Sequence, residues 1–300
     1  MKKPSTLDRR SFNQLLATGA LLSPLYGFTA PPAKLGSKMK MGLVTYLWGK
    51  DWDLPTLIEN CSKAKTFGVE LRIEHAHAVT LDLSQNDRQE VKKRFADSRV
   101  TCLGMGTNQA YHYADSARLK TEIEGTKEYI KLSHDIGGTG VKVKPNAFPK
   151  GVSKEKTIEQ IGKSLNEVGK FGADYGQVIR VEVHGRGTQE LPNMKAIMDI
   201  ADHPNVKVCW NCNDQDLIGE GLEHNFNLVK DRFGDTVHIR EVNVGAYPYP
   251  ALAKLFTAID YDGWILLECR TNPEDKLAAM KEQRKLWNKM VKQARREIKA

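Results

Sequence analysis

Acidic, imidazole and guanidinium side chains stand at the ends of apolar segments in the second half of the chain. The segment Val178–His184 closes with Glu182 and His184, and the last short apolar segment closes with Glu268 followed by Arg270. Residues two apart in an extended strand share a face, so Glu182 and His184 point the same way, as do Glu268 and Arg270. A charged group inside an apolar strand is costly unless it is paired or binds a metal.

Two further apolar segments carry the same signal. Val206–Asn211 ends with Asn211, and Asn213 lies two residues further on, so either amide could face the same centre. In the next segment, His238 shares a face with Arg240. Any one of these residues alone would be ordinary polarity at the end of a strand, but four successive segments with such residues favour a shared site.

Together the four segments offer two carboxylates, one imidazole and one amide oxygen. We predict that Glu182, Asn211, His238 and Glu268 bind one divalent metal ion, with Asn213 as the alternative to Asn211. Oxygen-rich donor sets with one imidazole suit Mn²⁺, Mg²⁺ or Co²⁺, and Zn²⁺ also accepts them.

The elements that must position these residues alternate regularly after residue 40. Short β-branched runs are followed by longer amphipathic stretches, eight times over. This alternation predicts an α/β fold with parallel strands and right-handed crossovers. Eight units in roughly 250 residues are typical of a single (β/α)8 TIM barrel, whose active site lies at the carboxyl ends of the strands. We expect strands at 41–46, 69–74, 100–105, 140–144, 178–184, 206–211, 237–242 and 264–268.

A doubly wound open sheet is the alternative architecture. Its dinucleotide fingerprint needs a third glycine, but Gly104-x-Gly106 is followed by Thr107, Asn108 and Gln109. The spacing therefore favours the closed barrel. We place the barrel at residues 40–300, after a Pro- and Gly-containing linker at 31–39.

The first 30 residues have the features of an export signal. Arg9 and Arg10 precede Ser11-Phe12 and the apolar run Leu15–Phe28. This order indicates a twin-arginine signal and a protein exported to the periplasm or cell envelope. A Sec signal or a retained anchor is the alternative. Since Leu15–Phe28 is short of the roughly 20 apolar residues of a spanning helix, we expect no stable membrane span after processing.

Charge and cysteine content exclude several partner classes. The formal net charge is +8, much of it in the last helical stretch, which we interpret as a solvated face. No nucleic-acid module with interleaved aromatic residues accompanies it, so we predict no nucleic-acid partner. Cys209 and Cys212 form a lone Cys-x-x-Cys inside a strand, so buried thiols are expected there, and neither a redox pair nor a zinc site.

In this order the motifs resemble a known family. They are Gly68-Val69-Glu70-Leu71-Arg72, Val181-Glu182-Val183-His184-Gly185, His203-Pro204-Asn205-Val206 and Val237-His238-Ile239-Arg240-Glu241. Residues 40–295 resemble the xylose isomerase-like TIM barrels, in particular the sugar phosphate isomerase/epimerase group with its D-tagatose 3-epimerase relatives. The resemblance implies one divalent metal held by Glu182, a residue of the sixth strand, His238 and Glu268. The epimerases have an aspartate in the sixth strand, where this chain has Asn211, which can bind only through its neutral carbonyl oxygen.

The resemblance also implies a chemistry for these residues. Glu182 and Glu268 would remove and return a proton next to the carbonyl of a small carbohydrate, with a metal-stabilised enediolate between the two steps. His184, Arg240 and Arg270 would hold hydroxyls or developing negative charge. The expected function is an exported carbohydrate isomerase or epimerase. Where a leaving group lies one carbon further on, the same site would act as a 3-keto-glycoside lyase.

Two other functions remain open. A secreted sugar-binding barrel without turnover is consistent with Asn211. An apurinic endonuclease-like hydrolase would need three metals and more histidine and aspartate ligands than these strands carry. Three residues outside the metal set are also predicted to contact substrate: His112, Lys144 and Trp48, the last by stacking on a sugar ring if it is not core. A buried ion pair with Glu70 or Glu182 is the alternative for Lys144.

Overall fold

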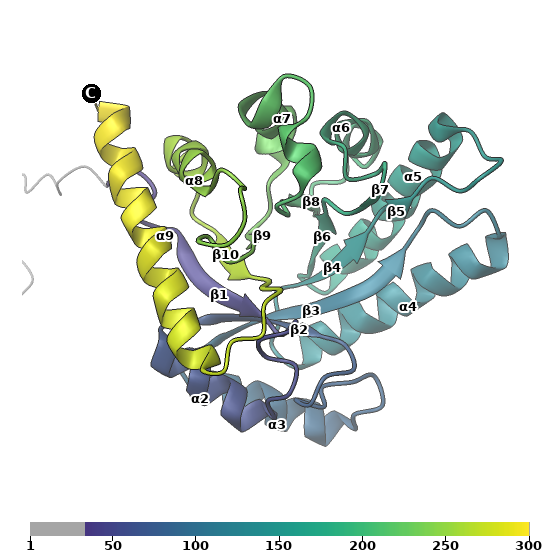
Figure 1. Ribbon diagram of the computed structural model, residues 1–300. Helices are drawn as coiled ribbons and strands as arrows, with labels where there is room; N and C mark the ends of the chain where they lie inside the picture. The colour runs from purple at the N-terminus through teal and green to yellow at the C-terminus, as the bar shows by residue number, and fades with distance from the viewer. Residues whose placement is uncertain (1–33, 300) are drawn as a thin grey trace, which may run out of the picture. The chain divides into compact units, whose positions relative to one another are not determined.

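The structure is a computed structural model that describes residues 34–299, and residues 34–300 form one compact unit. The predicted signal segment and most of the linker lie outside the described residues. Eight barrel strands alternate with eight α-helices, which lie around the outside of the barrel (Figure 1), and two further two-residue strands, β5 (Asn146–Ala147) and β7 (Gly185–Arg186), pair with each other. Within the described part of the chain, no helix is both long enough and apolar enough to cross a bilayer.

All eight predicted strands are present, although most end one to three residues earlier than expected. They are β1 (Lys40–Val44), β2 (Gly68–Arg72), β3 (Thr101–Ala110), β4 (Gly140–Lys144), β6 (Val178–Glu182), β8 (Val206–Cys209), β9 (Thr236–Ile239) and β10 (Trp264–Leu267). The helices are α2 (Leu54–Ala64), α3 (Gln85–Ala96), α4 (Ser116–Asp135), α5 (Lys154–Asp174), α6 (Leu191–Ile200), α7 (Gly221–Val229), α8 (Tyr249–Ala258) and α9 (Lys276–Lys299). Short 3₁₀ turns lie at Asp214–Leu217 and Lys230–Arg232.

The strand order confirms the barrel and excludes the open sheet. All pairings are parallel, and the order β8-β6-β4-β3-β2-β1-β10-β9 follows the chain around a ring. A doubly wound sheet would reverse its strand order at a switch point. The last seam, between β8 and β9, is held by hydrogen bonds from the His238 amide to the Trp210 carbonyl (2.8 Å) and from the Gly234 amide to the Val208 carbonyl (2.9 Å).

Local sequence explains where several helices begin. Asp53, Ser84, Asp115 and Ser153 each accept a hydrogen bond from the backbone amide three residues later, which satisfies an otherwise unpaired donor at the helix start. These caps fix the lengths of the strand-to-helix loops at the carboxyl end of the barrel, where the polar strand ends meet.

The barrel interior holds buried ion pairs as well as apolar residues. Near the amino ends of the strands, the Arg180 guanidinium donates to Asp235 (Nε to Oδ1, 2.8 Å) and to the Thr139 hydroxyl (2.7 Å). Near the carboxyl ends, the Lys142 ammonium donates to Glu182 (2.7 Å). Pairing makes these burials tolerable. All five cysteines are buried and free, as expected for Cys209 and Cys212.

Candidate metal and sugar site

The carboxyl ends of the strands bring three of the predicted metal ligands together. Glu182 is the last residue of β6, His238 lies in β9, and Glu268 directly follows β10. One ligand atom of each lies within 4.8 Å of the others, and all three residues are buried. Strands far apart in sequence therefore converge on one centre, as the strand-end pattern predicted.

Asn211, two residues beyond β8, completes this centre. Its Nδ2 donates to Glu182 Oε1 (2.8 Å) and lies 3.4 Å from Glu268 Oε2, while its buried Oδ1 has no partner among the described residues. Asn213 is committed elsewhere, because its Nδ2 donates to the Val183 carbonyl (2.8 Å) and its backbone amide donates to Asp216 (2.9 Å). Of the two amides, Asn211 is thus the one aimed at the carboxylates.

The donor atoms left without partners fit a cation. Asn211 Oδ1 and His238 Nδ1 are both buried and have no hydrogen-bond partner within residues 34–299, and His238 Nδ1 lies 3.6 Å from Glu268 Oε2. A rotation of the Asn211 amide would exchange its two terminal atoms and present Oδ1 between the two carboxylates. Two carboxylate oxygens, one imidazole nitrogen and one amide oxygen form a set that Mn²⁺, Mg²⁺, Co²⁺ and Zn²⁺ accept.

Glu70, from the opposite side of the barrel, orients the histidine. Its carboxylate lies 3.4 Å from His238 Nε2, and both side chains are fully buried. Burial alone would lower the pKa of His238, but nearby acidic groups, including Glu70 and Glu268, hold that pKa well above its ordinary value. A carboxylate on one imidazole nitrogen leaves the other nitrogen free to bind a metal. From the sequence, Glu70 was named within a family motif and as an alternative partner for Lys144, and its contact with His238 was not predicted. A charged residue inside the apolar segment Gly68-Val69-Glu70-Leu71 was the signal that could have indicated a buried role.

The buried ion pair of Glu182 is formed by Lys142 and not by Lys144. Lys142 Nζ lies 2.7 Å from Glu182 Oε2, and it also donates to the Thr107 carbonyl (3.2 Å). Burial raises the pKa of Glu182, but the ammonium of Lys142 and other nearby cations hold that pKa well below its usual range. Glu182 is therefore an ionised carboxylate at neutral pH.

A small pocket of about 80 Å³ opens directly onto this centre. Its lining residues are Tyr46, Arg72, Lys144, Glu182, His184, Asn211, Glu268 and Arg270. The pocket lies at the strand ends, where TIM barrels carry their active sites, and its polar lining can hydrogen-bond hydroxyl groups.

Three cations face this pocket without an acidic partner in the described part of the chain. Arg72 and Lys144 both donate to Asn108 Oδ1 (2.9 and 3.1 Å), while Arg270 is exposed at the rim. Burial, together with the Lys142 ammonium, lowers the pKa of Lys144 to about 8. Arg72 and Tyr46 were not predicted as site residues, although Arg72 ends its strand just as Glu182 does.

Three predicted substrate contacts do not line the pocket. Trp48 is only 2% exposed, packs in the core and donates through Nε1 to the Thr271 carbonyl (3.0 Å), so it offers no free ring face to a sugar. The His112 ring lies against Tyr113, with ring centroids 4.1 Å apart. Arg240 Nη2 lies 3.4 Å from Asn213 Oδ1, and Arg240 does not line the pocket. His184, Lys144 and Arg270 do line the pocket.

Comparison with known proteins is consistent with this geometry. A family model described as "Xylose isomerase-like TIM barrel" matches residues 58–290. No curated protein matches the sequence.

Among solved structures, the fold is similar to that of apo 3-keto-D-glucoside 4-epimerase YcjR from E. coli, with a TM-score of 0.71 and 15% identity over 84% of this chain and 99% of that one. It is also similar to an L-ribulose 3-epimerase (TM-score 0.74, 16% identity, 87% and 97% covered). A third similar structure is the IOLI protein with a bound zinc atom (TM-score 0.67, 14% identity, 86% and 99% covered).

Proposed function

Because the chain belongs to the xylose isomerase-like TIM barrel family, we propose that it is a metal-dependent isomerase or epimerase of small carbohydrates. The observation that carries this proposal is the buried group of Glu182, His238 and Glu268, with Asn211 beside it, at the base of a polar pocket. Two of the structures with a similar fold are sugar epimerases, which supports the same class.

Four residues would hold the metal: Glu182, Asn211, His238 and Glu268. A divalent ion held there would act as a Lewis acid on oxygens of the sugar and thereby make a proton next to its carbonyl easier to remove. Asn211 contributes no charge, so the set supplies two negative charges from its carboxylates. We expect a metal that is bound less tightly and is more strongly Lewis acidic than in a site with three carboxylates.

The protein's own side chains would carry out the proton transfers. The Lys142 ammonium keeps Glu182 ionised, so Glu182 is in the form that can accept a proton from carbon. Glu268 follows β10, which is separated from β6 by β8 and β9 around the barrel, and it would return the proton from the other side of the substrate. Return to the opposite face of the same carbon gives an epimer, and return to the neighbouring carbon gives an isomer.

The cations of the pocket would position the substrate. His184, Lys144, Arg270 and Arg72 line it and can donate hydrogen bonds to hydroxyls or to an oxygen that gains negative charge.

Hydrogen–deuterium exchange tests the proposal. Protein purified without added ions is analysed for bound metal, and keto-sugars and 3-keto-glycosides are then incubated in D₂O with Mn²⁺, Co²⁺ or Mg²⁺. We expect deuterium at the carbon next to the carbonyl, together with an epimer or isomer. Exchange should vanish in Glu182→Gln and in Glu268→Gln but persist in Glu155→Gln, which changes an exposed glutamate at the start of α5.

The products separate the alternatives. An unsaturated sugar with a released aglycone would indicate the lyase reaction in place of epimerisation. Tight sugar binding without exchange, whichever metal is added, would indicate the non-catalytic sugar-binding barrel that Asn211 keeps open. Exchange unaffected by both glutamate substitutions would rule out the proposed pair.

We also propose that the protein is exported by the twin-arginine route, on the basis of Arg9, Arg10 and the apolar run Leu15–Phe28. Replacing both arginines with lysine should retain the protein in the cytoplasm, as measured by cell fractionation. Unchanged export of that variant, with export lost when the Sec pathway is blocked, would contradict the route.

A further inference from the structure

Positive charge is concentrated on a single element, the C-terminal helix α9. Lys276–Lys299 contains nine lysines and arginines and two glutamates, a net charge of +7. Residues 34–300 as a whole carry only +5, so the rest of this unit has a net charge of −2. The excess is therefore a property of one helix and not of the general surface.

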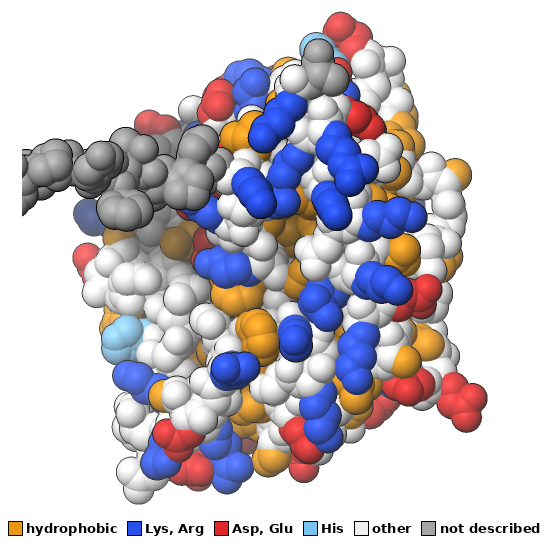
Figure 2. Space-filling view, turned by 90° about the vertical axis from the view of Figure 1, so that its left-hand side faces the viewer, with side chains coloured by type: hydrophobic (Ala, Val, Ile, Leu, Met, Phe, Trp, Pro, Cys, Tyr) orange, Lys and Arg blue, Asp and Glu red, His pale blue; other side chains and the backbone are white. Residues whose placement is uncertain are grey.

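The exposed cations of α9 lie on one stripe. At about 100° per residue, six of them fall within an arc of about 80°, which runs roughly 27 Å along the helix. They are Lys281, Lys285, Lys289, Lys292, Arg296 and Lys299, all exposed. The only other residue of the helix in that arc is Ala278, and the buried residues Met280, Trp287, Val291 and Ala294 lie on the opposite side. Figure 2 shows the resulting band of blue side chains on this face of the molecule.

Within residues 34–299, these six cations have no acidic partner of their own. The ion pairs of α9 are Lys276 with Asp51 (3.5 Å) and Glu297 with Lys254 (3.3 Å), and none of the six takes part in an ion pair within residues 34–299. Glu297 is thus already neutralised by its neighbour on α8. A stripe of unpaired like charges repels itself unless it meets anions.

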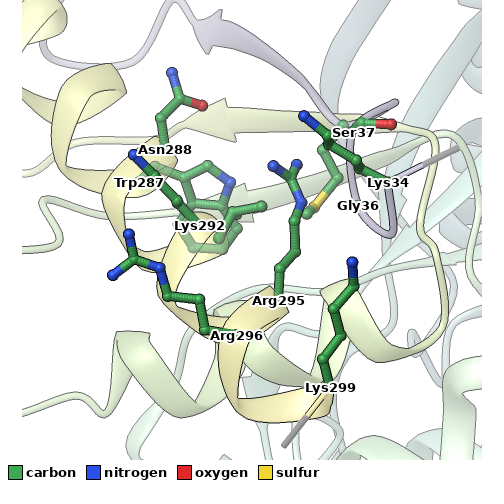
Figure 3. Close-up of a pocket in the computed structure, with 11 residues that line it drawn as sticks. Lys34, Gly36, Ser37, Trp287, Asn288, Lys292, Arg295, Arg296 and Lys299 are labelled. Atoms are coloured by element: carbon green, nitrogen blue, oxygen red, sulfur yellow. The ribbon is translucent and has the colours of Figure 1, made fainter.

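A groove beside the end of this stripe adds a second feature. It measures about 430 Å³ and lies between the last turns of α9 and the segment that leads into β1. Met39, Trp287 and Val291 supply apolar walls, while Lys34, Lys292, Arg296 and Lys299 surround the groove with positive charge (Figure 3). The Arg295 guanidinium donates to the Leu35 carbonyl and fixes this segment against the helix. Apolar walls surrounded by cations suit a ligand that has an anionic headgroup attached to an apolar chain.

We propose that the α9 face docks on an anionic phospholipid surface, with headgroup phosphates along the six-cation stripe and one headgroup in the groove. Lys34 lines the groove, and only five residues separate it in the chain from the apolar run Leu15–Phe28. The groove borders the segment before β1, at the amino end of the barrel, whereas the sugar pocket lies at the carboxyl ends. Docking would therefore leave the pocket open to solvent.

Vesicle co-sedimentation of the full chain tests this surface. The variant Lys285→Glu/Lys289→Glu/Lys292→Glu reverses three charges of the stripe. The matched control, Lys120→Glu/Lys156→Glu/Lys170→Glu, makes the same change in net charge at exposed lysines of α4 and α5. Both are compared with the unchanged protein on phosphatidylglycerol-containing vesicles and on pure phosphatidylcholine vesicles. Any contribution of the N-terminal apolar run is common to all three proteins and is measured on the neutral vesicles.

We expect the stripe variant to lose at least about tenfold in partition to phosphatidylglycerol, because each basic residue near an anionic surface contributes several-fold. The control should change by about twofold or less, and the advantage of anionic over neutral vesicles should disappear at roughly 0.5 M salt. If the glutamates impair folding, the triple glutamine variant at the same positions should show a smaller loss in the same direction.

Equal losses in the stripe and control variants would overturn the proposal, since net charge alone would then explain binding. Unchanged binding of the stripe variant would overturn it as well. So would a preference for double-stranded DNA over phosphatidylglycerol vesicles, because the stripe would then serve a different polyanion.

Discussion

Replacing Lys142 with methionine removes the ammonium that faces Glu182 inside the barrel. The two side chains are 0% and 2% exposed and lie 2.7 Å apart, so Glu182 would keep a buried charge without its main partner. Loss of one partner of a buried pair costs about 3–5 kcal/mol. We expect Lys142→Met to lower the free energy of unfolding by that amount, which corresponds to a fall in melting temperature of roughly 10 °C for a domain of this size.

A double-mutant cycle isolates the pair. Lys142→Met, Glu182→Gln and the double variant are compared by urea unfolding without metal. The double variant should be less destabilised than the sum of the single variants by at least about 2 kcal/mol, because it leaves no unpaired charge. Lys144→Met is the matched control on the same strand, and because Lys144 has no acidic partner in the described residues, it should cost less than about 1 kcal/mol.

Metal provides the decisive comparison. If Glu182 binds the ion, saturating Mn²⁺ supplies a second counter-charge and should recover part of the stability that Lys142→Met loses. The reasoning would be refuted by additive single and double variants, or by a Lys142→Met loss that is identical with and without metal.

Three further predictions concern neighbouring residues. His77 donates from Nε2 to the Arg72 carbonyl (2.8 Å) and accepts from the Val79 amide at Nδ1, and burial lowers its pKa to about 4. The folded state therefore binds a proton at His77 less readily than the unfolded chain, so the free energy of unfolding should fall by up to about 3 kcal/mol as pH drops from about 6.5 to 4. Urea unfolding of His77→Asn should lack this pH-dependent loss, and an unchanged dependence of stability on pH would contradict the prediction. Because the pKa of Lys144 is about 8, kcat/KM should decline above that pH as the Lys144 ammonium is lost. Lys144→Arg should move this decline to higher pH, and identical pH–rate profiles for the variant and the unchanged protein would exclude a role of Lys144 in substrate binding. Gly185 has φ +99°, and an added Cβ would overlap the Asn146 carbonyl, so Gly185→Ala should break the short pairing of β5 (Asn146–Ala147) with β7 (Gly185–Arg186). The substitution should act mainly on kcat and less on the melting temperature, and a change in melting temperature alone would argue against a positioning role.

Local sequence carried enough information for the barrel and for part of its site. Hydrophobic periodicity depends on residues within a few positions of one another, so eight strand–helix units could be counted from the sequence. The positions of Glu182, His238 and Glu268 followed because strand alternation fixes the face and parallel topology brings strand ends together. Their chemical types then indicated a divalent metal.

Other features depended on contacts that no local pattern encodes. Asn211 and Asn213 both lie beyond the last residue of β8, where strand alternation no longer fixes the direction of a side chain. The hydrogen bonds of Asn213 to Val183 and Asp216 hold it away from the centre, so Asn211 is the amide that faces the carboxylates.

Contacts between side chains across the barrel could not be predicted from the sequence either. Lys142 and Lys144 share one face by sequence, yet only the curvature and depth of the barrel bring Lys142 to Glu182 and leave Lys144 in the pocket. Glu70 reaches His238 from a strand 168 residues away in sequence.

The sequence by itself thus determined the period of the elements, the fold that follows from them and the residue types at the strand ends. Tertiary structure alone decided which polar groups pair and which remain free to bind. The reason is that hydrogen bonds and ion pairs depend on ångström-scale distances between distant strands, whereas periodicity depends only on neighbours along the chain.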